Sequence, residues 1–231
     1  MVNMRKSKLV LSAIVLLFAL AVGCSAEADI SAMEASKVVA KTQSALEKLS
    51  DKAVHTVETT TLTYPEGTDT VESERWYADS NCLYTGNQSD GITTTRLQYN
   101  DKVYTQISAS EEWVQSGAKD SFLPFGVNED TAEQFTESSL VSRKEENGEY
   151  CVVFSVLPQG GAQNYTKNET TLYFSTKWEL LRIENQAEYS MESWADGTVT
   201  NVISHMVVEY QDTSAKEIKK QLEAVYKLVC E

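Results

Sequence analysis

The sequence predicts an α+β fold, in which one antiparallel β-sheet of about nine to eleven strands carries an N-terminal helix, a short lid helix and a C-terminal helix. Two observations support this prediction. Between residues 54 and 212, short runs rich in threonine, valine and tyrosine alternate with period two and are separated by turn signals. On either side of this region, apolar residues recur at helical spacing.

The β region divides at short turn signals such as Asp90-Gly91, Asn147-Gly148 and Asp196-Gly197. Because turns of this length join strands that run in opposite directions, neighbouring strands are expected to pair antiparallel. The expected strands lie near residues 54–64, 70–79, 82–87, 92–99, 102–108, 112–116, 140–146, 149–157, 169–175, 180–190 and 198–210.

Capping boxes predict the start of both long helices. Ser31-Ala32-Met33-Glu34 and Ser214-Ala215-Lys216-Glu217 each place a serine three residues before a glutamate, so that each side chain can bond the other residue's amide. The first box predicts an amphipathic helix over residues 31–50. A third, short and polar helix is expected over residues 128–138, after the apolar loop 122–126. The apolar stripe of the last helix comprises Ile218, Leu222, Val225 and Val229, with Lys219, Lys220 and Lys227 facing away.

Two strands differ in how their faces are expected to be covered. From Leu181 to Tyr189 apolar and polar residues alternate, so one face of that strand is expected to meet water. From Tyr150 to Leu157 both faces are apolar. Both faces of that strand are therefore expected to be covered, and helices laid across the sheet are the obvious covering elements.

The N-terminal segment predicts export and lipid anchoring. A basic stretch, residues 5–8, precedes an apolar run, residues 9–22, that closes on Gly23-Cys24. This run would reach only about 21 Å as a helix, less than the ~30 Å hydrocarbon core, so a permanent membrane span is not expected. Its end resembles the bacterial lipobox, with Ala21 where leucine is more common. Ordinary signal-peptidase cleavage, which leaves Cys24 as a free thiol, is the alternative.

We expect residues 1–23 to be a cleaved signal peptide, residues 24–30 the lipidated cysteine with a short tether, and residues 31–231 a single domain. A tether this short places the domain on the extracytoplasmic face of the cell membrane, close to the lipid. Cleavage changes the net charge from −14 to −17, because the signal holds three basic groups and no acidic group. So acidic a surface repels nucleic acid, which is excluded as a partner.

Three cysteines, Cys82, Cys151 and Cys230, remain when Cys24 is assigned to lipid. At most one disulfide can form among them, and the spacing does not select a pair. Cys151 lies in an apolar strand and can also be a buried thiol. The wide spacing lacks the close pairs of a zinc site, so no metal is expected.

Two hairpins in which aromatic residues flank a polar turn resemble a known family. They are Tyr99-Asn100-Asp101-Lys102-Val103-Tyr104-Thr105 with Glu112-Trp113-Val114, and the segment from Leu172 to Ile183. Together with the N-terminal helix and the meander, they resemble the LolA/LppX-like bacterial lipoproteins, and most closely uncharacterised members from Gram-positive bacteria. The resemblance implies a curved, incompletely closed half-barrel with an apolar cavity under helices. It also implies binding of lipids, lipidated chains or protein partners.

Catalytic chemistry has little support in the sequence, which contains no Gly-x-Ser-x-Gly elbow, His-Glu-x-x-His helix or phosphate loop. The histidines are His55 and His205, and His205 is expected to be a structural residue of an apolar strand. The pairs Glu111-Glu112 and Glu129-Asp130 are expected to be solvated surface. We therefore expect no enzyme and no cofactor, with a carboxylate-based hydrolase as the open exception.

Six aromatic side chains are the candidates for lining a ligand cavity, since they fall around the middle strands and the expected lid. They are Trp76, Tyr104, Trp113, Phe122, Phe125 and Phe135. An ordinary aromatic core is the alternative. The preferred hypothesis is a membrane-anchored lipoprotein that holds an apolar or amphiphilic ligand, such as a lipid or a lipidated molecule, between sheet and helices. The alternative is a surface interaction or sensor protein with a filled core that docks a protein partner.

Overall fold

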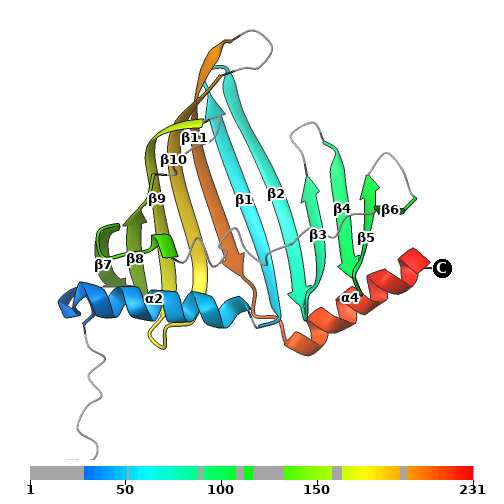
Figure 1. Cartoon of the computed structure of the whole chain (residues 1–231), viewed down its shortest axis with the longest axis horizontal. Helices are drawn as coiled ribbons and strands as arrows, with labels where there is room; N and C mark the ends of the chain where they lie inside the picture. The colour runs from blue at the N-terminus through cyan, green and yellow to red at the C-terminus, as the bar shows by residue number, and fades with distance from the viewer. Residues whose placement is uncertain are drawn as a thin grey trace, which may run out of the picture.

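The computed structural model describes residues 29–50, 52–87, 91–107, 112–116, 133–157, 163–192 and 197–230. Within these residues, eleven strands form one antiparallel sheet in the order β6-β5-β4-β3-β2-β1-β11-β10-β9-β8-β7 (Figure 1). The strands are β1 Val54–Tyr64, β2 Gly67–Ala78, β3 Asn81–Asn87, β4 Thr93–Tyr99, β5 Lys102–Ile107, β6 Val114–Ser116, β7 Leu140–Glu146, β8 Glu149–Ser155, β9 Gln163–Ser175, β10 Leu180–Glu192 and β11 Val199–Tyr210. The helices are the 3₁₀ turn η1 Ile30–Ala32, α2 Ala35–Ser50 and α4 Ala215–Cys230.

The predicted α+β class with one antiparallel sheet is confirmed, and the sheet is open, since its edge strands β6 and β7 are not paired with each other. Two-residue turns join several of its hairpins. Asp79-Ser80, Asn100-Asp101 and Asn147-Gly148 all have positive φ at both residues, the conformation that fits the twist of paired strands. Strand β9 begins six residues earlier than expected, at Gln163, where the polar stretch before residue 169 pairs with β10.

The strand register assigns side chains to two faces of the sheet. Val54 lies opposite Tyr77, and His55 lies opposite Trp76. Facing residues of paired strands share one side of a sheet, whereas consecutive residues of a strand point to opposite sides. We call the side that carries Val54 and Tyr77 the α2 face, and the side that carries His55 and Trp76 the α4 face, after the helix that packs on each.

Helix α2 covers the half of the sheet that ends at β7. Its predicted apolar stripe is buried against the fully enclosed side chains of Phe154, Leu172 and Phe174. Residues of α2 in this core are Val38, Val39, Ala45, Leu46 and Leu49.

Helix α4 covers the other half of the sheet, on the opposite face. Ile218 and Leu222 are buried against Leu83, Leu97 and Tyr104. Figure 1 shows that both helices cross the same end of the sheet, so the far ends of the long strands β1, β2 and β9–β11 extend beyond them. In the part of the chain that the structure describes, neither helix is long and apolar enough to cross a membrane.

Among the described residues a helix packs on the α2 face of β8, and none packs on its α4 face, where one was also expected. Tyr150, Val152 and Phe154 pack in the α2 core, as expected. On the other side, Cys151 is buried between the facing residues Lys144 of β7 and Tyr173 of β9. The stems and rings of these long side chains exclude water there.

The expected capping box at Ser31 is also wrong, because Asp29 competes for the same groups. The Asp29 carboxylate accepts hydrogen bonds from the Ser31 amide at 2.9 Å and the Ser31 hydroxyl at 2.7 Å, and these bonds lower its pKa. The chain therefore makes the turn η1 first, and α2 begins only at Ala35. The Glu34 carbonyl then accepts the amides of Lys37 and Val38.

The first five residues of the expected lid helix, residues 128–138, lie outside the described residues. Its described part is helical only at Glu133 and Gln134. A turn follows from Thr136 to Ser139, in which the Ser139 hydroxyl donates to the Gln134 carbonyl at 2.9 Å and accepts the Thr136 amide at 2.9 Å. These local bonds end the helix before Phe135, ahead of the predicted end at residue 138.

Replacement of Leu222 tests the docking of α4. Leu222 is 1% exposed, whereas Leu228 on the same helix is 71% exposed. Leu222→Ala should lower the free energy of unfolding by about 2–5 kcal/mol through lost burial and a cavity. Leu228→Ala, the matched control, should change it by less than about 0.5 kcal/mol. Urea denaturation measures both, and equal losses would contradict this packing.

Thiol labelling tests the placement of the three cysteines among the described residues, all of which are free in the structure. Cys230 is exposed, whereas Cys82 and Cys151 are buried. Burial raises the pKa of the Cys82 thiol from 9.0 to about 11, and only the thiolate reacts with a maleimide. The native protein should therefore be modified at Cys230 alone, and at the other two only after unfolding. Rapid native labelling of Cys82 by peptide mass spectrometry would show the placement to be wrong.

Candidate functional site

The candidate site lies on the α4 face, where β1 and β2 meet the connection that leads into α4. The facing residues His55 and Trp76 stack with their ring centroids 3.6 Å apart and their planes inclined by 15°. The side chain of His55 is only 12% exposed. Two neighbouring strands thus hold both rings in a fixed orientation.

Both nitrogens of the His55 ring have hydrogen-bond partners. Nε2 lies 2.7 Å from Oε1 of Glu74, two residues before Trp76 on β2. Nδ1 lies 3.0 Å from Oγ1 of Thr213, which belongs to the connection between β11 and α4. Because the carboxylate can only accept a proton, Nε2 is assigned as the donor, and Nδ1 then accepts the Thr213 hydroxyl hydrogen.

Helix α4 begins two residues after Thr213, and its start is fixed by the predicted capping box at Ser214, which is confirmed. The Ser214 Oγ accepts the Glu217 amide at 3.3 Å, and the Ser214 amide donates to Glu217 Oε2 at 3.1 Å. The hydroxyl of Ser214 also donates to this carboxylate at 2.6 Å. These bonds lower the pKa of Glu217, so its carboxylate is ionised at neutral pH.

A pocket of about 310 Å³, open to solvent, lies between Trp76 and α4. Trp76 of β2 and Thr213 of the connection line part of the pocket. Three successive turns of α4 supply the other lining residues. Its lining residues are Trp76, Thr213, Glu217, Lys220, Gln221 and Ala224. The pocket therefore combines an aromatic surface with a hydroxyl, a carboxylate, an amide and an ammonium group.

The structure separates the aromatic candidates instead of placing them around one cavity. Trp76, Tyr104 and Trp113 pack on the α4 face, whereas Phe135 is buried on the α2 face against Phe154, at a centroid distance of 4.7 Å. The separation follows from strand alternation, since neighbouring residues of a strand face opposite sides. Phe122, Phe125 and Cys24 lie outside the described residues.

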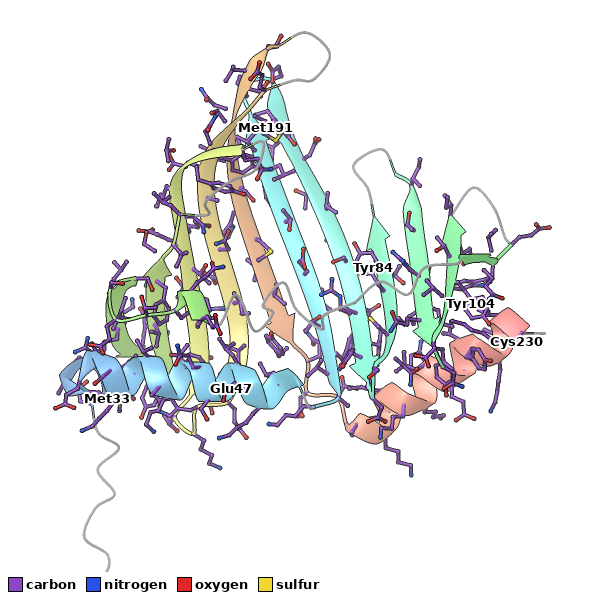
Figure 2. All side chains as sticks on the ribbon, in the orientation of Figure 1. Met33, Glu47, Tyr84, Tyr104, Met191 and Cys230 are labelled. Atoms are coloured by element: carbon purple, nitrogen blue, oxygen red, sulfur yellow. The ribbon has the colours of Figure 1, made fainter. Side chains whose placement is uncertain are left out.

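Among the separated candidates, only Trp76 lines the pocket. Tyr104 is 7% exposed and lies near the far end of α4, where Figure 2 shows it beside Cys230. The ring of Tyr226 stacks there on that of Tyr99, with the ring centroids 4.4 Å apart. Its centroid lies 6.2 Å from that of Tyr104. This end of the interface between α4 and the sheet is closed by rings, so the open space lies at the Trp76 end.

Sequence reasoning missed His55, Glu74, Thr213 and Lys220 as members of one site. His205, the histidine considered more closely, is exposed on β11. Strand alternation gives a signal for two of the four residues. Glu74 lies two residues before Trp76 on β2, so both point to the same face of the sheet, and His55 lies opposite Trp76 on β1. Thr213 and Lys220 could be placed only once the docking of α4 was known.

Neither a scan against protein-family models nor a search of curated proteins finds a match to the chain. Among solved structures, a LolA superfamily protein from Nitrosomonas europaea is similar at 10% identity and a TM-score of 0.30, over 78% of this chain and 93% of that one. A domain described as an outer membrane lipoprotein-sorting protein, from Vibrio parahaemolyticus, is similar at 11% identity and a TM-score of 0.28, over 82% of this chain and 99% of the other. MucB, solved in complex with MucA(peri), is similar at 13% identity and a TM-score of 0.21, over 80% and 97% of the two chains.

These likenesses extend over most of each chain and include the superfamily that the two hairpins resemble. Their TM-scores are too low to carry an argument about residues or ligands.

Proposed function

We propose that this chain is an exported lipoprotein, anchored to the membrane through Cys24, that binds a small amphiphilic ligand in the pocket between Trp76 and α4. The observation that carries the proposal is the lining of the pocket, in which one aromatic surface faces the charged side chains of Glu217 and Lys220. Ligand sites commonly join an apolar wall to a few convergent polar groups in this way. Placement in an uncharacterised Gram-positive branch of the LolA/LppX-like lipoproteins stays a prediction.

The size of the pocket limits the ligand. At about 310 Å³ it lies at the lower end of the roughly 300–1,000 Å³ of ordinary ligand sites. It suits a ring, a short acyl chain or one end of a longer amphiphile. Under both helices the described side chains are closely packed, with Phe154, Leu172 and Ile218 fully enclosed. Because this core is filled, a ligand bound at the surface is favoured over a lipid enclosed beneath the helices.

The chemistry of the lining orients such a ligand. Its apolar part covers Trp76, whose ring stacks on that of His55 with the ring centroids 3.6 Å apart. Its polar part meets Lys220 and Gln221 on α4. A carboxylate head would pair with the Lys220 ammonium, which it would share with Glu217, because the charge of Lys220 also lowers the pKa of that carboxyl group.

Charge reversal at Lys220 tests this site. The chain, as cells process it, is titrated with a fluorescent short-chain fatty acid. Lys220→Glu should weaken binding at least about fivefold by replacing attraction with repulsion. Lys216→Glu, one turn earlier on α4 and outside the pocket lining, should leave the affinity unchanged. Equal affinities for all three proteins, or no binding by the unmodified chain, would refute the proposed site.

Anchoring is tested separately by cell fractionation. Replacement of Cys24 by serine removes the only atom that can carry the thioether, so Cys24→Ser protein should leave the membrane fraction. Cys230→Ser, the control, should stay with the membranes. Mass spectrometry of the N-terminal peptide should show acylated Cys24 as the first residue of the native protein. An unmodified cysteine at that position would contradict lipidation.

A further inference from the structure

We propose that the same pocket carries out acyl transfer, with Thr213 as the nucleophile, His55 as its general base and Glu74 as the residue that positions His55. The substrate class is a small ester with an apolar acyl group, which would lie on Trp76. This inference rests on the proposed binding site and is independent of the membrane anchor. The sequence predicted no enzyme because it contains no known catalytic motif. The three residues proposed here lie in three separate segments of the chain, so a local sequence motif does not contain them.

The geometry is that of an activated hydroxyl. Thr213 Oγ1 lies 3.0 Å from His55 Nδ1, and His55 Nε2 lies 2.7 Å from Glu74 Oε1. A nucleophile within hydrogen-bond reach of a base, which is itself oriented by a third group, is the arrangement that makes a weak hydroxyl reactive. The carboxylate selects the tautomer with hydrogen on Nε2, which leaves the Nδ1 lone pair directed at the Thr213 hydroxyl.

A histidine that only tied α4 to the sheet would make the same two hydrogen bonds. The distinguishing feature is access, because Thr213 also lines the solvent-open pocket. Thr213 therefore holds its hydroxyl at a largely enclosed base, 12% exposed, and is also part of the wall of a space of ligand size. The stacked Trp76 ring holds the base in plane while it forms one wall of that space.

Positive groups for the negative charge that develops on the ester oxygen are Lys220 and the start of α4, although the ionised Glu217 lines the same pocket and opposes them. Lys220 lines the same pocket as Thr213. The 16-residue helix α4 begins two residues after Thr213, so the positive end of its dipole lies at this part of the chain. Groups of this kind, fixed before the reaction, stabilise an oxyanion.

The reaction balances with water as the second substrate. Thr213 Oγ1 forms a bond to the carbonyl carbon of the ester while its proton moves to His55 Nδ1. The bond to the leaving alkoxide then breaks, and the alkoxide takes that proton from His55. Water, losing a proton to His55, attacks the acyl-threonine, and the carboxylic acid leaves as the Thr213 hydroxyl is restored.

Hydrolysis of p-nitrophenyl butyrate by the chain, as cells process it, tests the inference. Thr213→Val and His55→Gln should each lower the rate by about 100-fold or more, because each removes a reacting group. Thr213→Ser, which keeps the hydroxyl, should retain activity. Thr63→Val, an exposed threonine of β1 outside the pocket, is the matched control and should be unchanged. Glu74→Gln should lower kcat and leave KM unchanged, while urea denaturation shows the variant to be as fully folded as the unmodified chain, so that the lower kcat reports the positioning of His55.

A fluorophosphonate probe with mass mapping gives a second readout and should label Thr213 alone. An unmodified chain that hydrolyses the ester no faster than Thr213→Val, and takes no label at Thr213, would overturn the inference. Binding of the fluorescent fatty acid by the unmodified chain separates the two proposals. Retained binding without hydrolysis removes only the acyl transfer, whereas loss of binding by the unmodified chain removes the proposed binding function.

Discussion

The pairing of β1 with β11 is the interaction on which the rest of the structure depends. Strands β1–β6 and β7–β11 are each a meander of neighbours, and eight facing residue pairs, from Thr56 and Tyr210 to Thr63 and Ile203, join them into one sheet. The pairing also brings the end of β11, and hence the start of α4, beside β1. Without this pairing, Thr213 and His55 would not lie close to each other.

Alternation along β1 then determines what each helix covers. Val54 points into the core under α2, and His55, one residue later, points to the side where α4 packs. A slip of one residue in this register would exchange the two, burying an imidazole under α2 and removing it from Glu74 and Thr213. The fold and the candidate site are therefore specified by the same strand, which makes changes near His55 costly to both.

Features of the fold and the site that depend on neighbouring residues could be predicted from the sequence, whereas features that depend on distant residues could not. The bounds of β1 and the capping box at Ser214 followed from nearby residues, through alternation and a spacing of three. The start of α2 was misplaced because the Asp29 carboxylate attracts Ser31 more strongly than the Glu34 amide does. The contact of His55 with Thr213 spans 158 residues and depends on register and helix docking together, which no local pattern contains.

The central claim is that ligand binds on the α4 face, against Trp76. The most direct test follows the indole signals of the four tryptophans by heteronuclear NMR while the fluorescent fatty acid is added. The account predicts that the Trp76 signal moves, whereas that of Trp178, packed against Phe174 on the opposite face at 5.2 Å, stays in place. A shift at Trp178 with no change at Trp76 would place the ligand on the other face and contradict the account.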